Sequence, residues 1–181
     1  MFETITALDI GSTSIKCMTI RTGLRDFQIK DIIIEEIDKQ IENRNEAVHE
    51  ALFRVLEQAE IKSQAVVTNL PMERLIIRNI SFPFSDVEKI AEAIPFEAEE
   101  NIPFKLDDLV MDFQSLKSAK EDEGRILLAA AHKNGMYNDL DILGEHTIKP
   151  VKMGMESNAL FECYGYFNKI EDESVIQLDI G

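Results

Sequence analysis

The stretch Asp9-Ile10-Gly11-Ser12-Thr13-Ser14-Ile15-Lys16 decides the fold of this chain. It joins two apolar segments, 4–10 and 14–22, and predicts a tight antiparallel hairpin. At the turn, Gly11 lets the backbone approach phosphate oxygens closely, and the amide and hydroxyl groups of Ser12 and Thr13 can donate to them. Asp9 can hold the water shell of a Mg²⁺ ion. The same residues also suit an ordinary tight turn, so this stretch alone leaves both interpretations open.

The pattern occurs a second time near the end of the sequence. Residues 175–181 form an apolar run that closes with Asp179-Ile180-Gly181. Two turns of this strand-Asp-x-Gly kind are what a paired phosphate clamp requires. The second copy therefore favours a phosphate site over an ordinary turn.

The rest of the chain alternates strand and helix patterns. After the hairpin we expect a strand over 26–37, a helix over 45–60 with Asn45 as its N-cap, and strands over 65–68 and 75–80. Ser85 is expected to cap a helix that Pro95 kinks or breaks, and we favour two pieces. The remaining elements that we expect are strands over 107–117 and 125–131, a helix over 134–143, a strand over 147–152, a helix over 157–167 and a strand over 174–180.

The composition excludes several classes of protein. Of the 181 residues, 45% are apolar and 29% are charged, as in globular domains. The 19 basic and 34 acidic side chains give a net charge of −15, the wrong sign for general nucleic-acid binding. The longest apolar run, 126–131, is far shorter than the ~20 residues that cross a bilayer, so we expect no membrane-spanning segment.

The cysteines and histidines form no recognisable motif. Cys17 and Cys163 lack CxxC spacing, and we expect both to be reduced thiols. His49, His132 and His146 are far apart, and none has a second ligand at the spacing of a metal motif. We therefore expect no metal centre built on histidine or cysteine.

The two Asp-x-Gly turns resemble those of the actin, Hsp70 and sugar-kinase superfamily of ATPases, in which two such hairpins face each other across the nucleotide phosphates. The resemblance implies that Asp9 and Asp179 hold Mg²⁺ through water. It also implies phosphate contacts from the remaining turn residues, namely Gly11, Ser12, Thr13, Lys16 and Gly181. Glu156-Ser157-Asn158-Ala159 resembles the superfamily's Glu-x-x-Ala element, which implies that Glu156 orients Mg²⁺ and the attacking water. Alternatively, Glu156 only satisfies the dipole of the helix that it opens.

The middle of the chain narrows the resemblance to the PilM and GspL family, on the FtsA-like branch of that superfamily. Residues 69–80, which contain Leu70-Pro71, resemble a strand pair of PilM. Residues 97–113, which contain Ile102-Pro103-Phe104, resemble the stretch that follows in PilM. Ile94-Pro95-Phe96 departs from PilM and resembles a Leu-Pro-aromatic motif of GspL. FtsA itself is a weaker alternative, because its inserted module is longer.

The resemblance implies an α/β (α+β) fold of the actin-like ATPase, ribonuclease H-like kind. We expect a first subdomain over 1–81 and 146–181, with a small αββα subdomain inserted over 82–145 as in FtsA and PilM. From the resemblance we expect that the rest of the actin-like fold is missing from this sequence. Such a chain is either truncated from a longer protein or a naturally abbreviated module. We expect truncation, because a strand that ends in Asp-x-Gly would be an unfinished edge.

The resemblance also implies a function in assembly. We expect a cytoplasmic platform component of a type IV pilus or type II secretion system, held at the inner membrane by partners or as the cytoplasmic domain of a single-span protein. The implied partners are a PilN- or GspM-like membrane protein, a GspE- or PilB-like motor ATPase and a second copy of the chain. The acidic stretch 97–100 suits basic partner segments.

The resemblance leaves an enzymatic alternative open. We expect no enzymatic activity and no cofactor in this chain by itself. The alternative is an ATPase that binds ATP and Mg²⁺ only when the protein is complete. An FtsA-like cell-division protein is the remaining alternative.

Overall fold

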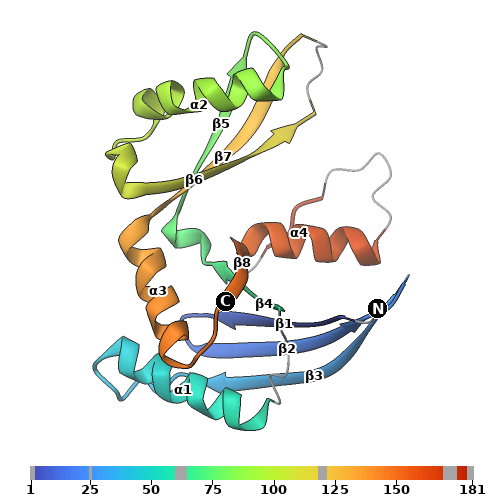
Figure 1. Ribbon diagram of the computed structural model, residues 1–181, viewed down its shortest axis with the longest axis vertical. Coiled ribbons are helices and arrows are strands. Elements are labelled where there is room, and N and C mark those ends of the chain that lie inside the picture. The colour runs from blue at the N-terminus through green and yellow to red at the C-terminus, as the bar shows by residue number, and fades with distance from the viewer. Residues whose placement is uncertain (1–2, 25, 60–64, 118–121, 169–174, 179–181) are drawn as a thin grey trace. The chain divides into compact units, whose positions relative to one another are not determined.

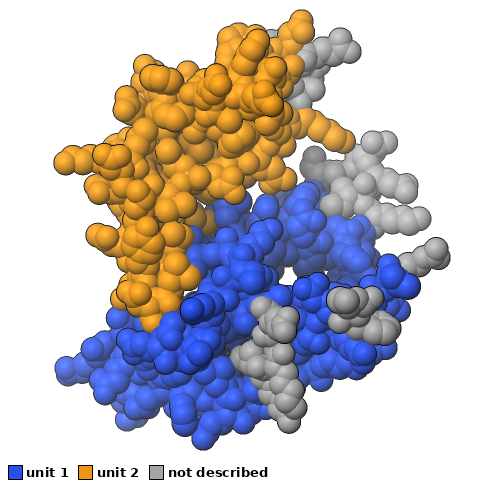
Figure 2. Space-filling view, viewed as in Figure 1, with its two compact units in different colours: residues 1–72, 142–181 blue, residues 73–141 orange. Residues whose placement is uncertain are grey.

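The computed structural model describes residues 3–24, 26–59, 65–117, 122–168 and 175–178. The chain folds into two compact units, 1–72 with 142–181 and 73–141 (Figures 1 and 2). Within the described residues, no helix is both long and apolar enough to span a bilayer.

The first unit is built on a five-stranded sheet in the order β3-β2-β1-β4-β8. Its strands are β1 (Glu3–Ile10), β2 (Ser14–Thr22), β3 (Phe27–Glu36), β4 (Ala65–Leu70) and β8 (Pro150–Met155). The first three strands form the predicted antiparallel hairpin and its extension, whereas β1, β4 and β8 run parallel. Parallel strands end at the same sheet edge, so the carboxyl ends of β1, β4 and β8 lie together.

Two helices flank this sheet, α1 (Arg44–Gln58) and α4 (Glu156–Phe167), and Figure 1 shows them on opposite sides of it. The core lies under α1 and includes Leu8, Ile15, Cys17, Ala51, Leu52 and Val55, all buried. Each large apolar side chain that is fully buried contributes about 1.5–3 kcal/mol to stability. The N-cap of α1 is Asn43, whose side chain accepts from the amide of Asn45 at 3.0 Å, so the expected cap at Asn45 was wrong.

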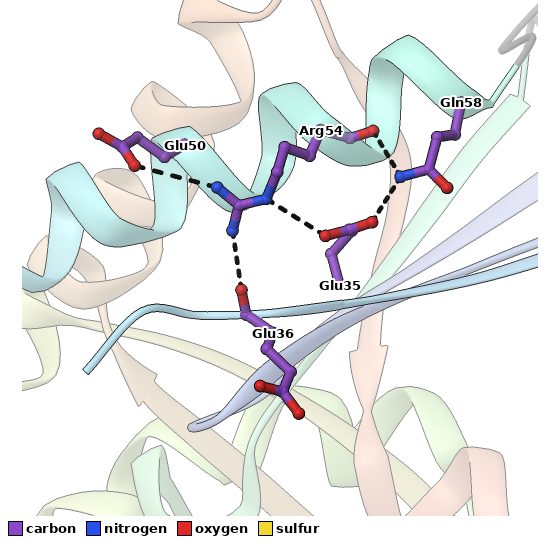
Figure 3. Close-up of polar contacts among 5 residues, drawn as sticks. All are labelled: Glu35, Glu36, Glu50, Arg54 and Gln58. Carbon is purple, nitrogen blue, oxygen red and sulfur yellow. Dashed lines mark hydrogen bonds and ion pairs between the residues drawn. The ribbon is translucent and has the colours of Figure 1, made fainter. Parts of the chain in front are cut away.

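Polar contacts also fasten α1 to β3 (Figure 3). Nε of Arg54 donates to Oε2 of Glu35 at 3.2 Å, and its Nη2 donates to the carbonyl oxygen of Glu36 at 2.9 Å. The side-chain amide of Gln58 donates to the other carboxylate oxygen of Glu35. Arg54 therefore bridges a side chain and a backbone carbonyl of the same strand.

The second unit is built on a three-stranded antiparallel sheet in the order β5-β7-β6. Its strands are β5 (Leu75–Phe82), β6 (Leu109–Leu116) and β7 (Gly124–His132). The helix α2 (Val87–Asn101) packs Ile90, Ile94 and Ala98 against the buried side chains of β5 and β7. Short 3-10 turns precede β5 and β6 (Met72–Arg74 and Leu106–Asp108), and α3 (Lys133–Glu145) leads from this unit back to the first.

Two expectations from the sequence are not met in the second unit. The strand predicted over 75–80 was grouped with the first subdomain, but it is β5 and pairs with β7. Its local apolar pattern suits either sheet, so only the pairing partner decides. The predicted break at Pro95 was also wrong, since α2 is continuous. Pro95 lies on the exposed side, as does Ala91, whose carbonyl loses its helical partner and can bond to water instead.

Two C-terminal elements differ from the bounds that the sequence predicted. The strand expected over 147–152 is β8, from Pro150 to Met155, because Thr147 lies in a turn at φ 64° that ends α3. Of the strand expected over 174–180, the described part, 175–178, belongs to no strand and is exposed.

Candidate functional site

The candidate site lies where β1, β4 and β8 end. In the sheet register, Leu8 lies beside Thr68, which lies beside Met153. Asp9 follows Leu8 directly, and Glu156 follows the last residue of β8. The fold therefore brings Asp9 and Glu156 to one edge of one sheet, the usual location of ligand sites in sheets with parallel strands.

Asp9 and Lys16 form a cross-strand pair at this edge. They are direct partners in the β1–β2 register, and Nζ of Lys16 lies 3.4 Å from Oδ2 of Asp9. The side chains are 34% and 58% exposed, respectively. Because Leu8 and Ile15, their neighbours, point into the core under α1, this pair lies on the opposite face of the sheet. An exposed pair of this kind adds only about 0–1 kcal/mol, so both groups are available to a ligand.

The turn between the two strands is fixed through its backbone. The amide of Gly11 donates to the carbonyl oxygen of Ser14 at 3.0 Å, and an added Cβ would lie 3.1 Å from that same oxygen. Arg44, the first residue of α1, donates to the carbonyl oxygens of Gly11 and Ser12, and the amide of Ile37 donates to that of Thr13. Within the described part of the chain, the amides of Ser12 and Thr13 have no hydrogen-bond partner.

Sequence reasoning missed Arg44, although the sequence holds a signal for it. A cation in the first turn of a helix opposes the helix dipole and costs about 0.3–1 kcal/mol. Such a residue therefore needs a compensating contact, and the two carbonyl oxygens of the turn supply it.

Glu156 opens α4 and is half-buried. Its Oε2 accepts the backbone amide of Met72, 3.4 Å away, and so links the segment after β4 to the start of α4. This contact gives Glu156 a structural role, and its role in orienting Mg²⁺ and water stays a prediction. Asp179 and Gly181, the other half of the predicted clamp, lie outside the described residues.

Two of the three histidines meet in the first unit. Nδ1 of His49 lies 3.0 Å from Nε2 of His146, and Nε2 of His49 lies 3.4 Å from Oε2 of Glu145. Burial lowers the pKa of His146, and the neighbouring His49 lowers it further. The described residues include no group of three side chains that could hold a metal ion.

The solvent-facing side of α2 carries a second candidate feature. Phe96 is 74% exposed, although it lies in the middle of the helix. Glu92, Glu99 and Glu100 lie four positions before, three after and four after it, on the same helical face, and all three are exposed. Among the described residues no ion pair engages them. We call these four residues the acidic α2 face; Glu97, also predicted to meet partners, is half-buried beside it.

Comparisons with known proteins agree with the predicted family. Residues 7–181 match the family described as type IV pilus assembly protein PilM. A solved structure of a PilM–PilN type IV pilus biogenesis complex is similar over 90% of this chain and 50% of that chain, with a TM-score of 0.76 and 22% identity.

A second similar structure is the cytoplasmic domain of EpsL, an inner-membrane component of the type II secretion system of Vibrio cholerae. It is similar over 86% of this chain and 57% of that chain, with a TM-score of 0.54 and 13% identity. The chain thus spans about half the length of these solved structures, and their likeness confirms the predicted actin-like α/β fold. Because the family match extends over nearly the whole sequence, the chain belongs to the type IV pilus assembly protein PilM family.

Proposed function

We propose that the protein is a non-catalytic platform component of a type IV pilus or a related type II secretion system. Family membership and the similarity to PilM in a PilM–PilN complex support this proposal. The protein would act in the cytoplasm, at the inner membrane, by binding the cytoplasmic segment of a PilN-like membrane protein. A motor ATPase of the PilB or GspE kind and a second copy of the chain are further proposed partners.

The observation that carries partner docking is the acidic α2 face. Phe96 is 74% exposed, so a partner that covers its ring removes apolar surface from water. This burial favours association. The glutamates around it favour a basic partner, and the cytoplasmic flanks of membrane helices are rich in Lys and Arg. A short basic segment with an apolar anchor would satisfy both features.

Co-expression tests this proposal. The tagged protein is produced together with the PilN-like protein of the same genome, extracted in detergent and purified through the tag. We expect the partner to co-purify with the native protein, and to be lost with Phe96→Ser or with Glu99→Lys combined with Glu100→Lys. Glu57→Lys, an exposed charge reversal on α1, is the control and should retain the partner. Equal recovery with all variants would contradict docking on the acidic α2 face.

A second function, binding of nucleotide phosphates, is favoured by the turn after β1. Two successive amides without partners, two hydroxyl side chains and the exposed Lys16 suit phosphate oxygens, and Asp9 suits the water shell of Mg²⁺. The residues described here therefore fit one side of a nucleotide–Mg²⁺ site. Bound Mg²⁺ would supply positive charge at the phosphates.

Calorimetry with Mg-ATP tests this second function in the protein extended to the length of its relatives. We propose that Asp179, Gly181 and Glu156 complete the site there. Binding that Asp9→Ala abolishes would support it. An absence of binding at millimolar Mg-ATP would contradict this second function, and only the platform function would then stand.

A further inference from the structure

The three carbonyl groups of the turn all accept hydrogen bonds from the protein itself. Nη2 of Arg44 lies 3.0 Å from the carbonyl oxygen of Gly11, and its Nη1 lies 3.2 Å from that of Ser12. The amide of Ile37 lies 2.9 Å from the carbonyl oxygen of Thr13. Arg44 is the first residue of α1, so the carbonyl groups of Gly11 and Ser12 are turned toward the start of that helix. Ile37 directly follows β3, so its bond to Thr13 continues the pairing of β2 with β3.

This orientation determines where the amides of the turn point. In a trans peptide the carbonyl and the amide of the following residue point in opposite directions, and no described peptide bond is cis. Fixing the carbonyl of Gly11 toward Arg44 therefore turns the amide of Ser12 away from it. In the same way, fixing the carbonyl of Ser12 toward Arg44 turns the amide of Thr13 away from it. These amides therefore point away from the start of α1, and Asp9 and Lys16 lie on the sheet face opposite to α1.

An arginine suits this arrangement better than a lysine does. The planar guanidinium presents several N–H groups in a fixed fork, so one side chain can hold two successive carbonyl oxygens. A lysine offers a single nitrogen on a flexible stem and lacks this fork. The position also opposes the dipole of α1, which indicates that Arg44 serves the turn and not the helix.

A comparison within α1 separates these roles. Arg54 binds the side chain of Glu35 and the carbonyl oxygen of Glu36, and so fastens the middle of α1 to β3 (Figure 3). Among the described residues, its side chain makes no hydrogen bond or ion pair with the turn after β1. The two arginines thus each join α1 to the sheet, but only Arg44 binds the turn.

We propose that Arg44 is a positioning residue for anion binding: it holds the carbonyls of Gly11 and Ser12 so that the amides of Ser12 and Thr13 face phosphate oxygens. This inference rests on the proposed phosphate function and adds a residue to it. Arg44 itself would not touch the anion. Its loss would let the turn rotate, so the two amides would no longer point together.

Amide NMR of the protein extended to the length of its relatives, with inorganic pyrophosphate and Mg²⁺ as the probe, tests this inference. In the native protein we expect saturable shifts of the Ser12 and Thr13 amide signals. Arg44→Gln should weaken the affinity about fivefold, as expected for lost hydrogen bonds to a charged donor, and should speed hydrogen exchange at these two amides. The affinity of Arg44→Lys should lie between those of the native protein and Arg44→Gln. Arg54→Gln is the matched control: it should lower thermal stability and leave the affinity within about twofold of native.

The outcomes separate the two proposals. If the native protein shows no shifts at Ser12 and Thr13, phosphate binding by the turn is wrong, and the role of Arg44 with it. If the native protein binds, and Arg44→Lys and Arg44→Gln bind as tightly with unchanged exchange, only the role of Arg44 is wrong. If Arg54→Gln weakens binding as much as Arg44→Gln, the effect reflects the docking of α1, and the specific role of Arg44 is again overturned.

Discussion

The imidazole rings of His49 and His146 share a hydrogen bond, with 3.0 Å between Nδ1 of the first and Nε2 of the second. The bond joins α1 to the turn that ends α3, across 97 positions of sequence. A hydrogen bond between two ring nitrogens requires one of them to be unprotonated. The contact therefore depends on pH in the range where histidine titrates.

Stability should accordingly fall when the pH drops below the usual pKa of histidine. Burial, followed by the charge of His49, lowers the pKa of His146, while Glu145 opposes the shift. The unfolded chain then binds a proton at higher pH than the folded chain does. The contribution is complete above about pH 6.5 and is lost as the pH falls through the lowered pKa. Urea unfolding at several pH values measures it, and His146→Gln should flatten the profile below pH ~6.5. An identical slope in both proteins would contradict this prediction.

A second pH effect should appear at more acidic values. The hydrogen bond from Gln58, followed by that from Arg54, lowers the pKa of Glu35. For an acid with a lowered pKa, the stabilisation is present above its usual pKa and is lost as the pH falls through the lowered value. We expect Gln58→Ala to reduce the acid dependence of the melting temperature below about pH 4.5, with Gln40→Ala, an exposed amide substitution, as the control. If both variants melt like the native protein at every pH, the contact to Glu35 has no such effect.

Two glycine substitutions should have opposite effects on the stability of the second unit. At Gly124, the first residue of β7, an added Cβ would overlap the backbone carbonyl oxygen of Phe84 and the side chain of Ile90. Gly124→Ala should therefore lower the free energy of unfolding by about 1–3 kcal/mol.

Gly135 in α3 is the matched site, because an added Cβ there meets nothing within 4 Å. Gly135→Ala should stabilise by about 0.4–1 kcal/mol, since alanine restricts the unfolded chain. Denaturant unfolding of both variants checks this pair of predictions. Destabilisation by Gly135→Ala, or none by Gly124→Ala, would show that the packing around these glycines differs from that described here.

Local sequence patterns predicted most of the elements but not their partners. The alternation in 14–22 and the helical spacing of Val48, Leu52 and Val55 indicate β2 and α1 almost to the residue. The pairing of β5 with β7 could not be predicted in this way, because the apolar pattern of a strand does not specify which neighbouring strand it pairs with. The N-cap of α1 was placed two residues late because Asn43 and Asn45 are the same residue type.

The candidate site was predicted in part. Asp9, Gly11 and Lys16 are close in sequence, so a hairpin necessarily brings them together. Arg44 and the pair of His49 and His146 were missed because their contacts span long stretches of chain and depend on the tertiary fold. Phe96 is exposed because the buried side of α2 is formed by Ile90, Ile94 and Ala98, and the helical repeat places Phe96 away from that side.

Direct titration of the protein with a partner peptide tests the central claim, that this chain is a docking platform for a basic cytoplasmic segment. The peptide is the cytoplasmic N-terminal segment of the PilN-like protein of the same genome, and the measurement is isothermal titration calorimetry at ~0.1 M and ~0.5 M NaCl. We predict saturable binding that weakens at the higher salt concentration, and about tenfold weaker binding for Glu99→Lys combined with Glu100→Lys. An absence of binding, or binding that neither salt nor this double variant changes, would contradict the claim.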